Sequence, residues 1–188
     1  MHLTEHPNLA GRTLVYHVTR AAWTPDIAAS RALLAATARR DPVRHSWGAN
    51  DAAGADLVCL SLLPSWAIQN SRFPGEEAAI LGFEIRAVLD LPGVQPCPLN
   101  SGSHAATPYL TGEVDPHRAL DECRNVRTGE LLVPDAVPLG ALKLIVLSDD
   151  EAVERWQSAI YEALGDEMAE AVTIRACRRS AGTAPSLS

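Results

Sequence analysis

The stretch GELLVPDAVPLGALKLIVLSD, residues 129–149, contains two apolar runs joined by a proline-rich connection, and this pattern decides the fold class. Residues 130–133 (ELLV) and 142–147 (LKLIVL) are short and apolar, so both predict buried strands. Pro134 and Asp135 predict a turn after the first strand. Ser148 and Glu151 predict a capping box that opens a helix, whose apolar face carries Val153, Trp156, Ile160 and Leu164.

Upstream and downstream of this stretch, further strands and helices follow without a regular β-α-β order. Residues 13–18 (TLVYHV), 56–62 (DLVCLSL), 78–85 (AAILGFEI) and 170–177 predict strands. Residues 26–38 (DIAASRALLAATA) predict a helix, as do shorter pieces at 86–91 and around 116–123. Residues 41–55 and 95–106 are rich in Gly, Pro and polar side chains and predict loops without regular structure. The sequence therefore predicts an α+β fold, with one domain over 1–177 and a flexible tail over 178–188.

Composition restricts the class of protein further. With 188 residues, 47% apolar and 21% charged, the chain is long enough for one ordinary globular domain. No apolar stretch approaches the ~20 residues that cross a bilayer, so we expect a cytoplasmic protein without a membrane partner. The four cysteines are widely spaced, which predicts buried thiols and argues against a zinc site.

Charge is unevenly distributed along the chain. The net charge of −7 argues against a general nucleic-acid binder, because affinity for a polyanion depends on phosphate neutralisation. Residues 1–50 nevertheless carry six arginines against three acidic residues, a balance of +3. We therefore expect any anionic ligand to meet this first quarter of the chain.

Single residues leave their roles open at this point. Glu130, at the start of an apolar run, is either a solvated strand end or a buried functional carboxylate. His17, between Tyr16 and Val18, is either a core histidine or a ligand. Residues 100–104 gather hydrogen-bonding side chains in one loop. The absence of a G-x-G-x-x-G motif means that any use of NAD would not come from a Rossmann unit.

Taken in order, four fragments resemble the DarT-like family of ADP-ribosyltransferases, enzymes that use NAD to modify bases in DNA. They are YHVT at 16–19, WGAN at 47–50 with DLVCLSLLPSWAI at 56–68, CPLNSGSHAA at 97–106, and the stretch 129–149 quoted above. The resemblance covers roughly residues 14 to 156. It implies an ADP-ribosyltransferase-like split antiparallel or mixed β-sheet with flanking helices, and NAD as co-substrate with no metal.

The resemblance also implies roles for particular residues. Glu130 corresponds to the catalytic acid, and Arg40 is the expected site arginine, with Arg39 and Arg44 as alternatives. His17 and Thr19 correspond to the nicotinamide side of the NAD site. Further NAD contacts are expected from three polar residues, namely Ser61, Asn100 and His104.

The implied acceptor is a nucleobase, most plausibly in single-stranded DNA, where bases are not hidden in a duplex. Arg44 supplies charge for such a substrate, and Trp47 supplies a ring on which a base can stack. Alternatives stay open: the same NAD chemistry on RNA, a nucleoside, a small molecule or a protein, or a nucleotide-binding module without turnover. A toxin role with an antitoxin partner protein is a further expectation.

Overall fold

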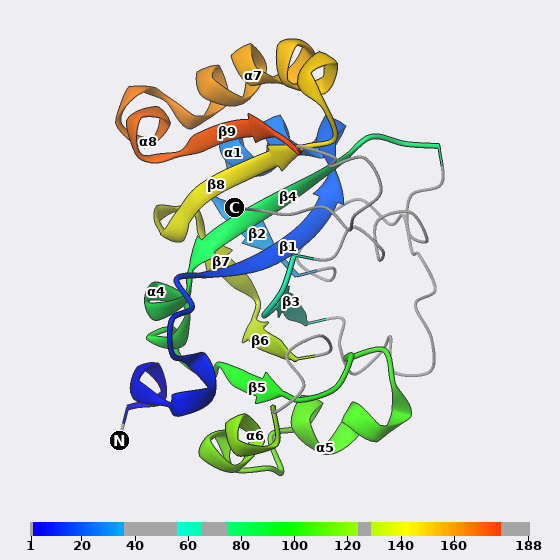
Figure 1. Ribbon diagram of the computed structural model, residues 1–188, viewed down its shortest axis with the longest axis vertical. Coiled ribbons are helices and arrows are strands. Elements are labelled where there is room, and N and C mark those ends of the chain that lie inside the picture. Colours follow the sequence, from blue (N-terminus) through cyan, green and yellow to red (C-terminus); the bar gives the residue numbers. More distant parts are fainter. Residues whose placement is uncertain (1, 36–55, 65–74, 124–128, 178–188) are drawn as a thin grey trace. The chain divides into compact units, whose positions relative to one another are not determined.

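The computed structural model describes residues 2–35, 56–64, 75–123 and 129–177 (Figure 1). They form two compact units. Unit one contains three stretches of chain, Met1–Val15, Leu33–Leu63 and Glu84–Val137. Unit two contains the three stretches that alternate with them, Tyr16–Ala32, Pro64–Phe83 and Pro138–Ser188. The prediction that residues 1–177 form one domain stays a prediction, and the expected tail lies outside the described residues.

Unit one is built on three antiparallel strands. Strand β6 (Glu130–Pro134) lies between β3 (Leu57–Ser61) and β5 (Gln95–Cys97). Strand β6 is paired on both edges, and Leu131, Leu132 and Val133 are almost completely buried, so both faces of the strand are covered. Strands β2 (Ala32–Leu34) and β7 (Ala136–Pro138) form a separate short pair. Strand β7 follows the turn at Asp135, which has a φ of 59°.

Helices cover the β5 side of this unit. Helices α5 (Thr107–Leu110) and α6 (Pro116–Glu122) both contact β5. The Tyr109 hydroxyl donates to Glu122, which also accepts from Arg118 Nε at 3.1 Å, so the two helices are linked to each other. Under them, Cys97, Ala106 and Leu132 form a buried cluster. The short helix α4 (Ile85–Leu89) contacts the 3-10 turn Leu3–Glu5.

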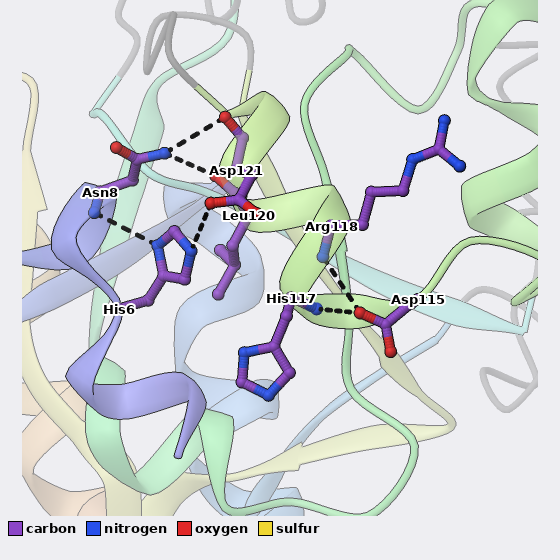
Figure 2. Close-up of polar contacts among 7 residues, drawn as sticks. All are labelled: His6, Asn8, Asp115, His117, Arg118, Leu120 and Asp121. Atoms are coloured by element: carbon purple, nitrogen blue, oxygen red, sulfur yellow. Dashed lines mark hydrogen bonds and ion pairs between the residues drawn. The ribbon is translucent and has the colours of Figure 1, made fainter. Parts of the chain in front are cut away.

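Side chains of the N-terminal segment, His6 and Asn8, form hydrogen bonds with helix α6 (Figure 2). The His6 imidazole is 4% exposed, and its Nε2 lies 3.1 Å from Asp121 Oδ1. Its Nδ1 accepts from the Asn8 N–H at 3.3 Å, so the neutral ring carries its proton on Nε2 and donates it to Asp121. The Asn8 side chain donates to the Leu120 carbonyl at 2.7 Å. At the other end of α6, Asp115 Oδ1 accepts two backbone N–H groups as N-cap.

Unit two contains the strand order β1-β4-β8-β9, in which β1 (Leu14–Arg20) begins in unit one. Strand β4 (Ala78–Glu84) pairs antiparallel with β8 (Leu142–Leu147), and β8 pairs parallel with β9 (Thr173–Ala176). Helix α7 (Asp150–Leu164) packs against α1 (Thr24–Ser30) and β9, and α8 (Asp166–Ala171) precedes β9. Parallel and antiparallel pairs with flanking helices confirm the predicted α+β class.

The predicted helix over 26–38 is wrong at residues 31–35, and residues 36–38 lie outside the described part of the chain. Helix α1 ends at Ser30, and Arg31 follows in the left-handed conformation with a φ of 59°. The Ser30 hydroxyl lies 2.8 Å from the Ile27 carbonyl oxygen and 2.7 Å from that of Ala32, which closes the turn. Leu33 is then completely buried in strand β2, so pairing with β7 outweighs local helix propensity.

Two smaller predictions also need correction. Residues 95–106 are not without regular structure, because Gln95–Cys97 is a strand and His104–Ala106 a 3-10 turn. The start of α7 is not the predicted capping box: Asp149 is the N-cap, and its Oδ1 accepts the Ala152 N–H at 2.8 Å. Ser148 instead donates to the Asp149 carboxylate.

Two further findings concern membranes and thiols. Within the described residues, no helix is both long and apolar enough to span a bilayer. The four cysteines are thiols, as predicted; three are buried, and Cys59 is only partly so.

Candidate functional site

A row of three side chains crosses the sheet of unit one at the start of β6. Glu130 is directly opposite Ser61 on β3 and directly opposite Cys97 on β5. Because directly paired residues of neighbouring strands project from the same face, these three side chains share one face. The sequence singled out Ser61 and Glu130 separately, and the antiparallel register brings them together.

The Glu130 carboxylate is buried, with only 5% of the residue exposed. Its Oε2 accepts the backbone N–H of Ser101 at 2.9 Å. The Ser101 hydroxyl lies 3.2 Å from Cys59 Sγ, one step further along the same face of β3. A buried carboxylate is costly unless donors satisfy it, so this N–H supports the charged form of Glu130. Of the two readings of Glu130, the solvated strand end is wrong.

A glycine precedes Glu130 for a steric reason. The Gly129 carbonyl accepts the Leu62 N–H at 2.9 Å, which continues the β3 pairing past Ser61. A Cβ on Gly129 would lie 2.8 Å from Leu62 Cδ1, closer than carbon atoms approach. Glycine at 129 therefore leaves room for the buried Leu62 side chain beside the start of β6.

The thiol beside Glu130 is kept protonated. Burial raises the pKa of Cys97 to about 12, and the negative charge of Glu130 adds to the rise. The Cys97 thiol also donates to the Leu99 carbonyl at 3.2 Å. A thiol in this state is a poor nucleophile, so the chemistry of this row rests on the carboxylate.

The loop after β5 carries two of the predicted contacts, Asn100 and His104. Both are exposed, and His104 opens the 3-10 turn over residues 104–106. The Asn100 side-chain oxygen accepts the Gly102 N–H at 2.9 Å, so it shapes the loop around Ser101. Sequence reasoning placed Ser101 in this polar cluster but did not assign it to the site, and it also missed Cys59.

The remaining predicted residues lie in unit two or outside the described part of the chain. His17 and Thr19 are on β1, where strand alternation places their side chains on one face; Thr19 is 2% exposed and His17 half-buried. Arg39, Arg40, Arg44 and Trp47 fall outside the described residues. The roles proposed for these four stay predictions.

Three other arginines of the first quarter are engaged within the fold. Arg12 Nη1 donates to the Leu62 carbonyl at 2.9 Å. Arg20 pairs with Glu76 at 2.6 Å and lies over the Trp23 ring, 4.3 Å from its centroid. Arg31 Nη1 donates to the Leu164 carbonyl at the end of α7 and lies 2.9 Å from Met168 Sδ. The expectation that an anionic ligand meets the first quarter of the chain is therefore not supported by the contacts of Arg12, Arg20 and Arg31.

Within the described ranges, no group of three or more His, Cys, Asp or Glu side chains is arranged to hold a metal ion.

Comparison with solved structures identifies the fold. The DarT of Thermus sp. 2.9 in complex with NAD+ matches with a TM-score of 0.60 and 19% identity over 93% of this chain and 97% of that one. The same protein in complex with ADP-ribosylated ssDNA matches with 0.59 and 19%, over 89% and 94%. The Thermosipho africanus DarTG in complex with ADP-ribose gives 0.57 and 14%, over 87% of this chain and 49% of that one. No protein-family model and no curated protein sequence matches the chain.

The chain therefore has an ADP-ribosyltransferase fold. Within that class, the fold is the DarT-like one, as the four sequence fragments implied.

Proposed function

We propose that this protein is an NAD-dependent mono-ADP-ribosyltransferase whose acceptor is a nucleobase in single-stranded DNA. One observation carries the proposal: the buried Glu130 carboxylate, held by the Ser101 N–H at the start of the middle strand of unit one. The DarT-like fold supports it, because the Thermus relative was solved with NAD+ and with ADP-ribosylated ssDNA.

The chemistry requires a fixed negative charge. When the nicotinamide–ribose bond breaks, its electron pair leaves with nicotinamide, and positive charge develops at the ribose C1′ carbon and ring oxygen. A carboxylate held beside that centre stabilises the charge, and it can accept the proton that the acceptor loses as its lone pair bonds to C1′. We assign this role to Glu130. Ser61, on the same face, is proposed to contact NAD beside it.

Further NAD contacts are part of the proposal. His17 and Thr19 are proposed to bind the nicotinamide side, and Asn100 and His104 to contact NAD from the loop after β5. Arg40 is proposed to bind the pyrophosphate, because a guanidinium offers a planar fork of donors to phosphate oxygens. Arg44 and Trp47 are proposed to bind the nucleic acid. The toxin role and the antitoxin partner stay predictions.

A second candidate keeps the NAD chemistry but replaces the acceptor with a small molecule or a protein. The observation that favours it is the engagement of Arg12, Arg20 and Arg31 within the fold of a chain whose net charge is −7. Charge reversal at Arg44 separates the two acceptors. With a DNA acceptor, the change should lower transfer to single-stranded DNA in a salt-dependent way while NAD hydrolysis stays constant.

The test of the proposed function is nicotinamide release from NAD, with and without single-stranded DNA, by wild type and Glu130→Gln. The amide keeps the shape of the side chain and removes its charge, so turnover should fall at least ~100-fold while the fold is retained. Glu162→Gln, on the exposed side of α7, is the matched control and should be as active as wild type. Near-full activity of Glu130→Gln would refute the assignment.

A further inference from the structure

The loop between β5 and α5 contacts the carboxylate of Glu130 through its backbone. Ser101 donates its N–H to Glu130 Oε2 at 2.9 Å. A backbone donor cannot rotate away as a side chain can, so its direction is fixed by the path of the loop. We infer that Ser101 is a positioning residue that holds the Glu130 carboxylate in its productive orientation; this inference rests on the proposed function.

The loop is itself held on both sides of Ser101. The Asn100 carbonyl accepts the Ser103 N–H at 2.9 Å, and the Asn100 side chain accepts the Gly102 N–H at 2.9 Å. The Ser101 hydroxyl donates a hydrogen bond to Cys59 Sγ at 3.2 Å, which connects the loop to β3. Just before the loop, the Cys97 thiol donates a hydrogen bond to the Leu99 carbonyl. The two hydrogen bonds of Asn100, which shape the turn around Ser101, fix where the Ser101 N–H points.

This geometry allows the donor to be deleted while the turn is kept. The Ser103 N–H donates a hydrogen bond to the Asn100 carbonyl, which closes a β-turn over residues 100–103. Ser101 is the second residue of this turn, a position that favours proline. Ser101 is not among the described residues with positive φ, so its backbone does not conflict in sign with proline, whose φ is about −65°. Ser101→Pro therefore removes the N–H and preserves the turn, and because its Cδ takes the place of the amide hydrogen, it also pushes the Glu130 carboxylate away from its position. Ser101→Ala is the matched control, because it keeps the N–H and removes only the hydroxyl.

The kinetic test uses nicotinamide release at saturating NAD. A hydrogen bond to a charged group is strong enough that its loss in Ser101→Pro should lower kcat about 10- to 100-fold. The KM for NAD should stay within about twofold, because the bond acts on the carboxylate and not on substrate binding. Ser101→Ala should keep kcat within about threefold of wild type, because the N–H that donates to the carboxylate remains. In a Glu130→Gln background, Ser101→Pro should have no further effect, because both changes act through one carboxylate.

A measurement independent of turnover checks the contact itself. The Ser101 amide proton should exchange slowly in wild type, and its exchange should accelerate in Glu130→Ala, which removes the acceptor. Fast exchange in wild type would overturn the inference, as would equal kcat values for Ser101→Pro and wild type. A kcat loss that persists undiminished in the Glu130→Gln background would also overturn it. Wild-type protein that releases no nicotinamide although the Ser101 amide is protected would refute the proposed function, and the positioning role with it.

Discussion

Alanine at position 129 should destabilise the protein through one steric contact. The added Cβ would lie 2.8 Å from Leu62 Cδ1 and 3.5 Å from Leu62 Cγ. Gly129 is not among the glycines with positive φ, so alanine can adopt its backbone conformation and the collision is the main cost. Leu62 could relieve the contact only by moving, and it is 1% exposed within the core.

The magnitude follows from two opposing effects. Carbon atoms prefer a separation of about 3.5–4.0 Å, so the pair must move apart by roughly 0.7–1.2 Å. Overpacking of this kind in a core costs about 1–3 kcal/mol. Replacing glycine with alanine also stabilises by about 0.4–1 kcal/mol through the unfolded state, so we expect a net loss of about 1–2 kcal/mol. For a chain of this size, each kcal/mol lowers Tm by about 2–4 °C.

Urea denaturation and thermal melting of Gly129→Ala and Gly140→Ala provide the measurement. Gly140 is exposed, and a Cβ there would meet nothing within 4 Å, so its alanine variant should be neutral or slightly stabilising. In a double-mutant cycle with Leu62→Ala, the double variant should lose less stability than the sum of the single losses, because the smaller side chain relieves the collision. If Gly129→Ala proves as stable as Gly140→Ala, or if the cycle is additive, the steric reasoning is wrong.

Three further predictions concern stability. In urea denaturation, Arg31→Ala should lower the free energy of unfolding by about 1–2 kcal/mol, because it removes the hydrogen bond to the Leu164 carbonyl. Arg31→Gly should lower it by about 1 kcal/mol less, because glycine adopts a φ of 59° without strain. Equal losses for the two variants would contradict this. Asp149→Ala should lower the free energy of unfolding by about 1 kcal/mol and Ser148→Ala by less, since Asp149 accepts the Ala152 N–H. A larger loss for Ser148→Ala would instead indicate that Ser148 is the N-cap, as the predicted capping box requires. Burial raises the pKa of Cys97 and Cys123 from 9.0 to about 12 and about 11. The folded state therefore holds more protons than the unfolded state above pH 9, and the free energy of unfolding should fall as pH rises further. Cys97→Ala should flatten this fall, and an unchanged slope would refute the cause.

Local patterns were sufficient for strands β6 and β8. The runs at 130–133 and 142–147 are so apolar and so short that no other element suits them, and both are strands. Residues 26–38 were not decidable in this way, because Leu33 and Leu34 fit a helical stripe as well as a strand. Long-range pairing of β2 with β7, which no local window contains, settled the matter.

The candidate site shows the same limit. Glu130 was identified because a charged side chain at the edge of an apolar run carries a local signal. Ser101 was not assigned because it acts through its backbone N–H, which every residue except proline possesses. The placement of Ser61 beside Glu130 depends on the register of β3 against β6, and register is fixed by the assembled sheet.

The alternation of the two units along the chain has a consequence for how the protein is made. A ribosome delivers the chain from its N-terminus, so the first stretch of unit one must wait for residues up to 137 before its partners exist. Unit two is complete only when β9 has emerged, because β9 is paired with β8. No single cut of the chain yields a fragment that carries one whole unit and nothing of the other. Attempts to express either half alone should therefore give aggregation-prone pieces.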